Sequence, residues 1–228
     1  MIQTKNLTRS FKNGDVITQV LKGIDFAAHD GEFVSIMGRS GAGKSTLLYQ
    51  LSLLDDPTGG EILIDGHQAH TMSPEEKMLF RLVKFGYVFQ DYALLPELTA
   101  LENVALPLLM QGKGKREAYK ISQEALERAG LGKRLGNLSS QLSGGEQQRV
   151  SIVRAIAHQP KVLFADEPTA NLDNESSKVI MDIFLELHRA GQTIIMVTHE
   201  EPYAKLADRI VHLDDGKIVS TTENQRRG

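Results

Sequence analysis

The segment "GRSGAGKS" at residues 38–45 constrains the fold of this chain more than any other stretch. It fits the phosphate-loop pattern G-x-x-x-x-G-K-[ST], it follows the β-like run "EFVSIM", and it leads into a helical pattern. The leucines expected on one side of that helix are Leu47, Leu48, Leu51 and Leu54. This order of strand, loop and helix predicts an α/β phosphate-loop core that binds a nucleotide.

The residue types in this segment suit a nucleoside triphosphate with Mg²⁺. Glycines let backbone N–H groups curl around the β-phosphate, Lys44 reaches the β- and γ-phosphates, and the Ser45 hydroxyl can bind Mg²⁺. The expected nucleotide-binding residues here are Gly38, Ser40, Gly41, Gly43, Lys44, Ser45 and Thr46. A glycine turn beside a surface lysine is the simpler alternative, and the flanking strand and helix argue against it.

Four turn dipeptides separate short β-like runs: Asn13-Gly14, Asp30-Gly31, Asp65-Gly66 and Asp215-Gly216. Each suits a tight hairpin because Gly, Asn and Asp tolerate a positive φ. Three of them fall in the first third of the chain, so this third predicts a partly antiparallel sheet. Its expected strands are "GIDFAAH", "EFVSIMG" and "EILIDG".

After Gly41 the pattern becomes an alternation of strands and helices. The runs "KVLFAD" and "TIIMVT" are typical of strands buried on both faces of a parallel sheet. Helical patterns replace strands between Asp91 and Gln159, and Gly130 is the expected end of one of them. The sequence predicts one domain over residues 1–228, with a core at 1–90 and 160–228, a helical insertion at 91–159, and a tail "ENQRRG" that frays.

Composition excludes several classes of protein. The formal net charge is −3, which argues against nucleic acid as a partner. The absence of cysteine excludes disulfides and zinc–thiolate sites. The longest apolar stretch, "LTALENVALPLLM", is interrupted by Glu102 and Asn103 and bent by Pro107, so it is not expected to span a bilayer. The start of the chain lacks the apolar run of a secretory signal, and we expect the protein to stay in the compartment where it is made.

Polar residues follow both buried runs. Asp166 and Glu167 come at the end of "VLFADE", where open α/β sheets bind their ligands. Asp166 can hold Mg²⁺ through water, and Glu167 can polarise an attacking water, although the pair could also simply begin a loop. His199 follows "TIIMVT", where an imidazole could contact a γ-phosphate. The other histidines are expected at satisfied or surface positions: His29, His67, His70, His158, His188 and His212.

A second glycine-rich segment, "LSGGEQQ" at residues 142–148, opens another helical pattern. Its bare N–H groups and the positive end of the helix dipole suit an anion. The pattern leaves two alternatives open. The segment could face the nucleotide of its own chain, or one held by another copy.

The ordered set "GRSGAGKS", Gln90, "LSGGEQQ", "VLFADE", "NLD" and His199 resembles the ATP-binding cassette family. That family has a phosphate-loop ATPase core with an antiparallel β subdomain and a helical insertion. Its cassettes pack head to tail, so the resemblance implies a homodimer with two ATP and Mg²⁺. It also implies that Ser143, Gly144 and Gly145 bind the γ-phosphate of the ATP held by Lys44 of the partner chain.

The resemblance assigns roles to further residues. Gln90 becomes a sensor near Mg²⁺ and the attacking water, Glu167 the general base, His199 the γ-phosphate switch and Asp173 a residue at the dimer seam. Phe11 takes the place of the aromatic residue that stacks on adenine, where tyrosine is more common. The stretch "ANLD" stands where many cassettes have "SALD" or "SGLD", so it departs mildly from the family pattern.

The apolar stretch "DYALLPELTALENVALPLLMQG" implies a membrane partner. Its Tyr92, Leu94, Leu95 and Leu98 are either core contacts of the insertion or, as in transporter cassettes, part of a groove for a permease helix. The segments "LLPELTALENVALPLL" and "ADEPTANLD" together resemble the subgroup for lipoprotein release, macrolide export and antimicrobial-peptide resistance. This resemblance implies a cytoplasmic ATPase held on the inner face of the cell membrane by a permease, which exports or transmits force. The alternatives are a soluble cassette of another class, an ATP-dependent assembly module such as a cell-division cassette, and a small-molecule kinase.

Overall fold

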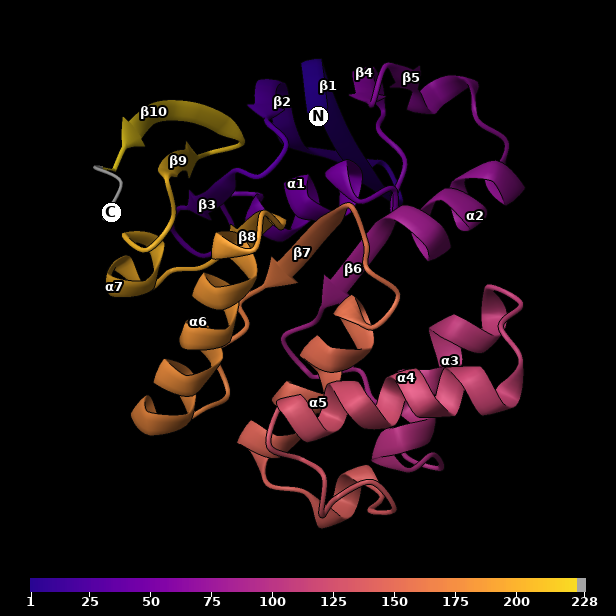
Figure 1. Cartoon of the computed structure of the whole chain (residues 1–228). Helices are drawn as coiled ribbons and strands as arrows, with labels where there is room; N and C mark the ends of the chain where they lie inside the picture. The colour runs from indigo at the N-terminus through magenta and orange to yellow at the C-terminus, as the bar shows by residue number, and fades with distance from the viewer. Residues whose placement is uncertain (225–228) are drawn as a thin grey trace. The chain divides into compact units, whose positions relative to one another are not determined.

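The computed structural model describes residues 1–224, and residues 225–228 lie outside the described part. Its contacts divide the chain into two compact units. The first unit comprises Met1–Leu79 and Leu187–Gly228, and the second comprises Phe80–Glu186. Figure 1 shows the helices and strands of both units, which are described separately below.

The first unit contains an antiparallel sheet in the order β2-β1-β4-β5. Its strands are β1 (Ile2–Asn13), β2 (Val16–Ala28), β4 (Gly59–Ile64) and β5 (His67–Gln68). Asn13-Gly14 lies at the turn between β1 and β2, and Asp65-Gly66 joins β4 to β5, so both predicted hairpins are confirmed. Apolar residues of these strands, such as Leu7, Leu21 and Ile24, are fully buried.

The first unit also contains a parallel arrangement around β3 (Phe33–Met37). This strand pairs in parallel with β8 (Thr193–Val197) on one side and β9 (Arg209–Asp214) on the other. The strand β10 (Lys217–Glu223) pairs antiparallel with β9 through the predicted turn at Asp215-Gly216. The buried run "TIIMVT" is therefore a parallel strand, as predicted.

The predicted hairpin at Asp30-Gly31 is wrong. A turn does occur there, but β2 and β3 belong to different sheets and do not pair. The reason lies in "FVSI", whose four residues are all buried, as in a strand covered on both faces. The antiparallel sheet predicted for this third of the chain therefore does not include "EFVSIMG".

Short helices complete the first unit. Helix α1 (Lys44–Leu51) buries Leu47, Leu48 and Leu51 as predicted, but Leu54 lies beyond its end and is 44% exposed. Leu53 has a φ of 59°, which turns the chain away from the helix. The others are the short η1 (Ala69–Thr71) and α7 (Glu201–Ala204), while α2 (Pro74–Lys84) crosses from the first unit into the second.

The second unit contains a parallel strand pair and the helical insertion. The strands are β6 (Phe85–Val88), which the sequence did not reveal, and β7 (Val162–Asp166), the predicted buried run. The helices are α3 (Ala100–Met110), α4 (Lys115–Arg128), the short η2 (Ser139–Gln141), α5 (Gly144–Ile156) and α6 (Asn174–Arg189), whose last residues belong to the first unit. Val104, Leu126 and Val150 bring α3, α4 and α5 together in one core (Figure 1).

The ends of these elements follow from local chemistry. Helix α3 begins at a capping box, in which Thr99 and Glu102 bond each other's backbone N–H groups, and it continues through Pro107. Helix α4 ends where predicted, with Gly130 at a φ of 74°. None of the helices formed by residues 1–224 combines the length and apolar character needed to cross a membrane.

The tail predicted to fray is held at its beginning. Glu223 is the last residue of β10, and the Asn224 backbone N–H donates to the Asp208 carbonyl over 2.8 Å. The Asn224 side chain donates to the Ala207 carbonyl over 2.8 Å. The rest of that prediction concerns residues 225–228, outside the described part.

Candidate nucleotide site

The phosphate loop lies in the first unit, between the end of β3 and the start of α1. Gly43, the residue before α1, has a φ of 98°, in the left-handed region that favours glycine. Glycine has no side chain that could bond the first N–H groups of the helix. The start of α1 therefore has no side-chain cap, as suits a phosphate-binding helix end.

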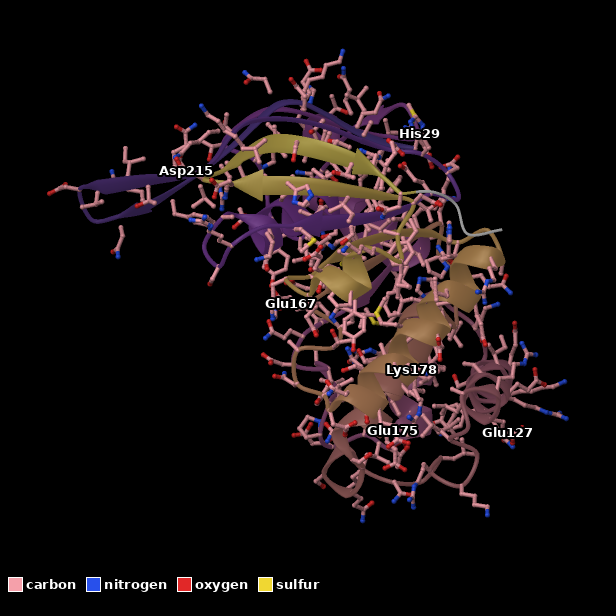
Figure 2. All side chains as sticks on the ribbon, turned by 90° about the vertical axis from the view of Figure 1, so that its left-hand side faces the viewer. His29, Glu127, Glu167, Glu175, Lys178 and Asp215 are labelled. Atoms are coloured by element: carbon pink, nitrogen blue, oxygen red, sulfur yellow. The ribbon has the colours of Figure 1, made fainter. Side chains whose placement is uncertain are left out.

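The turn between β9 and β10 fixes the shape of the loop. A Cβ atom on Gly38 would lie 2.1 Å from the carbonyl oxygen of Leu213, so only glycine fits. The Gly216 N–H donates to the Ala42 carbonyl over 3.1 Å. Asp215, in this turn, lies at one end of β9 and β10, and His29 lies toward their other end (Figure 2). The loop is thus shaped by backbone contacts at the Asp215 end.

Lys44 folds back across its own loop. The side chain is 7% exposed, and its Nζ donates to the Arg39 carbonyl over 3.2 Å. Ser45 and Thr46, in the first turn of α1, are half-buried. An ammonium group and a hydroxyl at one helix N-terminus suit a phosphate and its metal ion.

Phe11, the expected adenine platform, lies on β1 and is 44% exposed. The Arg9 guanidinium carbon lies 4.5 Å from the centroid of the Phe11 ring. Arg9 is itself held by Asp55, with 2.7 Å between its nitrogen and the carboxylate. One face of the ring therefore already carries a cation, while 44% of the residue stays exposed.

Parallel pairing brings predicted residues together within each unit. In the first unit, β3 and β8 are neighbours, so the phosphate loop and His199 follow the same edge of the sheet, and His199 is exposed there. In the second unit, β6 and β7 are neighbours, with Val88 opposite Ala165. Gln90 and the pair Asp166-Glu167 therefore follow a common edge too.

The two acids of the second unit have different environments. Asp166 ends β7 and is only 4% exposed. Glu167 is half-buried and has a φ of 47°, a left-handed conformation that costs a non-glycine residue roughly 1–2 kcal/mol. The following Pro168 carbonyl accepts a 2.6 Å bond from Gln148 of α5, which holds this loop in place. Glu167 lies well away from Glu175 at the start of α6 (Figure 2).

The segment "LSGGEQQ" forms the start of α5, so the predicted helix is confirmed, but not all of its first N–H groups are bare. Ser143 caps the helix by accepting from the Glu146 N–H, and Glu146 accepts from the Ser143 N–H over 2.8 Å. Arg134 binds the same carboxylate over 2.8 Å. The Ser143 N–H is the main reason that the pKa of Glu146 is lowered, and Arg134 adds to it. A Cβ on Gly144 or on Gly145 would lie 2.9 Å from the hydroxyl of Tyr92 or of Ser176, respectively.

Asp173, the expected seam residue, is exposed at the start of α6. Its carboxylate accepts bonds from the Ser176 N–H over 2.7 Å and from the Ser176 hydroxyl over 3.1 Å. These bonds, the backbone one foremost, lower the pKa of Asp173. In the single chain Asp173 therefore stabilises the start of its own helix.

Several contact residues escaped the sequence analysis. They are Arg9 beside Phe11, Arg134 beside Glu146, Gln148 and Arg154 on α5, and Asn171 near Gln90. Arg134, Gln148, Arg154 and Asn171 are polar residues whose contacts lie 12 or more positions away in sequence. Arg9 had a signal, because it stands two residues from Phe11 and side chains at i and i+2 of a strand share a face. Asn171 had another, because it departs from the more common residues of that stretch.

Known proteins resemble this chain over most of its length. The family model described as "ABC transporter" matches residues 21–170. The lipoprotein-releasing system ATP-binding protein LolD of Aquifex aeolicus is 51% identical over 201 residues, which cover 88% of this chain and 90% of that protein. The macrolide export ATP-binding/permease protein MacB of Brucella melitensis is 43% identical over 97% of this chain, but the match covers only 34% of MacB.

A solved structure shows the same fold. The dimeric, post-hydrolysis structure of the ATP-binding cassette MJ0796 bound to ADP and Pi superposes with a TM-score of 0.92. The two sequences are 40% identical, and the match covers 99% of each chain. Family model, relatives and fold agree with the expected α/β phosphate-loop ATPase with its helical insertion. The chain therefore belongs to the ABC transporter family, as one of its ATP-hydrolysing cassettes.

Proposed function

We propose that two copies of this chain bind two ATP molecules head to tail and drive a membrane permease. The observation that supports this proposal is the start of α5, where Ser143 and two glycines begin a second glycine-rich helix start in addition to that of α1. The dimeric state named for the similar MJ0796 structure supports the pairing. The names of LolD and MacB support a transporter of the lipoprotein-release or macrolide-export type.

The proposed roles follow the chemistry of each group. Lys44 and the amides of residues 38–46 bind the phosphates, Phe11 stacks on adenine, and Ser143, Gly144 and Gly145 bind the γ-phosphate held by the partner copy. Glu167 takes the proton of the attacking water, and His199 orients the γ-phosphate. Asp173 lies at the seam of the dimer. Residues 91–159 act as the helical subdomain of one ABC domain that spans the chain.

The donors present fit Mg²⁺. Asp166 offers a nearly buried carboxylate, Ser45 a hydroxyl at the start of α1, and Gln90 a side-chain amide oxygen, and Mg²⁺ prefers few protein oxygens with several waters. When bound, Mg²⁺ neutralises charge on the β- and γ-phosphates. The chain's own part is to hold the phosphates and align the water, so positioning and electrostatics supply the rate.

The permease contact is proposed at residues 91–99 and helix α3. Leu95 is 43% exposed and Met110 is 60% exposed, while Leu94 packs on the core of the insertion. Part of this apolar stretch is thus core, and part stays open to a partner. The chain would then act on the inner face of the cell membrane through that permease, with no nucleic acid involved.

Glu167→Gln tests the proposal, because it keeps the shape of the side chain and removes the base. We expect a monomer without nucleotide, a dimer with Mg-ATP in light scattering, and at least a hundredfold loss of ATP turnover, the order typical of a lost general base. Glu127→Gln, on the exposed face of α4 and far from Glu167, is the matched control (Figure 2).

Three results would count against the proposal. If Glu167→Gln binds ATP and stays monomeric even with its permease, the dimer role of "LSGGEQQ" fails. If the wild type dimerises but turns over no faster than the variant, the protein acts as an assembly module. If full turnover and dimerisation occur with no permease recoverable from the membrane, the chain is a cassette of a non-transport class.

A further inference from the structure

The loop after Gln90 is strained and held from outside. Tyr92 and Ala93 have φ values of 61° and 48°, so two consecutive non-glycine residues are left-handed. Arg154 of α5 donates to the Ala93 carbonyl over 2.6 Å and to the Tyr92 carbonyl over 2.9 Å. Burial lowers the pKa of Arg154 to about 10, so the guanidinium stays charged at neutral pH. Helix α5 therefore imposes this loop conformation.

The same loop exchanges hydrogen bonds with the stretch that leads to Asp173. The Asn171 side-chain amide donates to the Gln90 carbonyl over 3.1 Å. The Tyr92 hydroxyl donates to the Asn171 carbonyl over a long 3.3 Å. Burial and the neighbouring Asp91 raise the pKa of Tyr92, so the hydroxyl keeps the proton that it donates. Two bonds thus join segments that are about 80 residues apart in sequence.

Tyr92 also touches the start of α5. Its hydroxyl lies 2.9 Å from the point where a Cβ of Gly144 would stand. A methyl group at position 144 would force the Tyr92 hydroxyl to shift. One tyrosine therefore contacts both the stretch before Asp173 and the glycine pair of "LSGGEQQ".

We propose that Tyr92 and Asn171 form a latch that couples the two ATP sites of the dimer. This inference rests on the proposed function, in which Gln90 serves the ATP of its own chain, while Gly144 and Asp173 serve that of the partner. The latch is the hydrogen-bonded connection between these groups. Tyr92 and Asn171 are positioning residues, because they act through Gln90, Gly144 and Asp173.

The latch makes a specific kinetic prediction. A change at Gln90 in one site shifts Gly144 and the Asp173 stretch in the other, so the two sites respond together. Breaking the latch removes this coupling without changing how a single chain binds ATP. Cooperativity and kcat are therefore affected, while the affinity of the isolated chain for ATP is not.

The test uses Tyr92→Phe, Asn171→Ala and Asn171→Asp in the full chain. Tyr92→Phe removes only the hydroxyl. Asn171 is exposed, so its truncation leaves no cavity. Asn171→Asp keeps the shape but puts an acceptor against the Gln90 carbonyl and a charge near Asp91, whose carboxylate lies 3.5 Å from the Asn171 amide. Tyr119→Phe on α4 is the matched control for a lost tyrosine hydroxyl.

For each variant we would measure ATPase rate against ATP concentration, ATP affinity at a protein concentration too low for dimers, and ATP-dependent dimerisation in the Glu167→Gln background. We expect each latch variant to lower kcat by about three- to tenfold, the effect of one hydrogen bond. The Hill coefficient should fall toward 1, and Asn171→Asp should be at least as impaired as Asn171→Ala. The ATP affinity of the monomer should stay within about twofold of the wild type.

Four outcomes would overturn the latch. In the first, the latch variants keep the kcat and the Hill coefficient of the wild type. In the second and third, the wild type itself has a Hill coefficient of 1, or Asn171→Asp behaves as the wild type. In the fourth, the latch variants lose as much ATP affinity in the monomer as they lose in kcat. The last would make these residues merely structural. Failure of Glu167→Gln to dimerise with ATP is a separate result, which overturns the proposed function first.

Discussion

Helices α1 and α5 both begin at glycine-rich segments, but of the two only α5 has a side-chain cap at its start. Gly43 precedes α1 and has no side chain with which to cap it. Ser143 precedes α5 and forms a full capping box with Glu146. The start of α1 thus has no side-chain cap, whereas side chains satisfy two N–H groups at the start of α5.

The charged side chains in the first turns of α1 and α5 also differ, and the difference again favours an anion at α1. The first turn of α1 carries the Lys44 ammonium, which favours an anion. The first turn of α5 carries Glu146, whose charge favours the helix dipole but repels an incoming phosphate. Arg134, 2.8 Å from Glu146, offsets that repulsion. This contrast fits the proposed function, in which the phosphate loop binds the triphosphate and the start of α5 completes the site of the partner copy.

The glycines differ as well. Gly38 faces a backbone carbonyl, which cannot move without disturbing β9. Gly145 faces the Ser176 side chain, with its hydroxyl 2.9 Å and its Cβ 3.2 Å from a Cβ built on Gly145. A methyl group at each position should therefore have different consequences, and this makes the comparison testable.

Gly38→Ala should have the largest effect. The new methyl group would overlap the Leu213 carbonyl and force the loop or β9 to shift, which costs about 1–3 kcal/mol of unfolding free energy. Because the loop changes shape, ATP affinity in the isolated chain should fall by at least tenfold, as for a comparable cost in binding free energy. Titration with a fluorescent ATP analogue and denaturant unfolding measure the two effects. Normal affinity in Gly38→Ala would show that the backbone contact does not shape the loop.

Gly145→Ala should separate the two sites. The methyl group displaces the start of α5, so ATP-dependent dimerisation in the Glu167→Gln background should weaken by about five- to a hundredfold. ATP affinity of the single chain should stay within about twofold, because the phosphate loop is untouched. Light scattering and the same titration measure both. Adding Ser176→Ala removes the nearest atom and should restore part of the dimer, and a matching loss of monomer affinity would contradict the separation.

The sequence predicted the parts of the fold that depend on local pattern. Buried runs became β7 and β8, the phosphate loop lies between β3 and α1, and three turn dipeptides formed hairpins. The fourth, Asp30-Gly31, misled because a turn dipeptide gives the direction of the chain but not the sheet that receives the next strand. Strand β6 was missed because "FGYV" is short, and its Gly86 reflects a close approach to the Ala155 carbonyl rather than a turn.

The candidate site divides in the same way. The phosphate loop and "LSGGEQQ" are continuous backbone segments, so their chemistry can be read from neighbouring residues. The contacts of Asn171 with Gln90 and of Arg154 with Tyr92 join residues about 80 and 60 positions apart. No local pattern encodes such a contact, because it exists only once α5 and the loops have packed.

Arg134→Met tests the charge half of the comparison. The change removes the cation beside Glu146 and keeps an apolar side chain of similar length. Arg134 is half exposed, so we expect only about a two- to fivefold weakening of ATP-dependent dimerisation in the Glu167→Gln background. The loss should shrink at high salt, because salt screens the repulsion that remains. Light scattering at two salt concentrations measures it, and equal losses at both would favour a packing effect.

Glu146→Gln should have an effect of similar size and the opposite sign. Glutamine can still accept from the Ser143 N–H, so the capping box survives while the negative charge disappears. ATP-dependent dimerisation at low salt should therefore strengthen by about two- to fivefold, the range for one charge at a helix end.

The Glu146→Gln variant also removes a pH dependence of the folding stability. The folded pKa of Glu146 is lowered, so its contribution to stability is present above the unfolded pKa and is lost as the pH falls through the lower folded value. Thermal unfolding of the wild type should show this loss in acid, and Glu146→Gln should show less of it. If the variant instead dimerises more weakly than the wild type, the carboxylate helps the incoming phosphate to dock, and the proposed contrast between α1 and α5 fails.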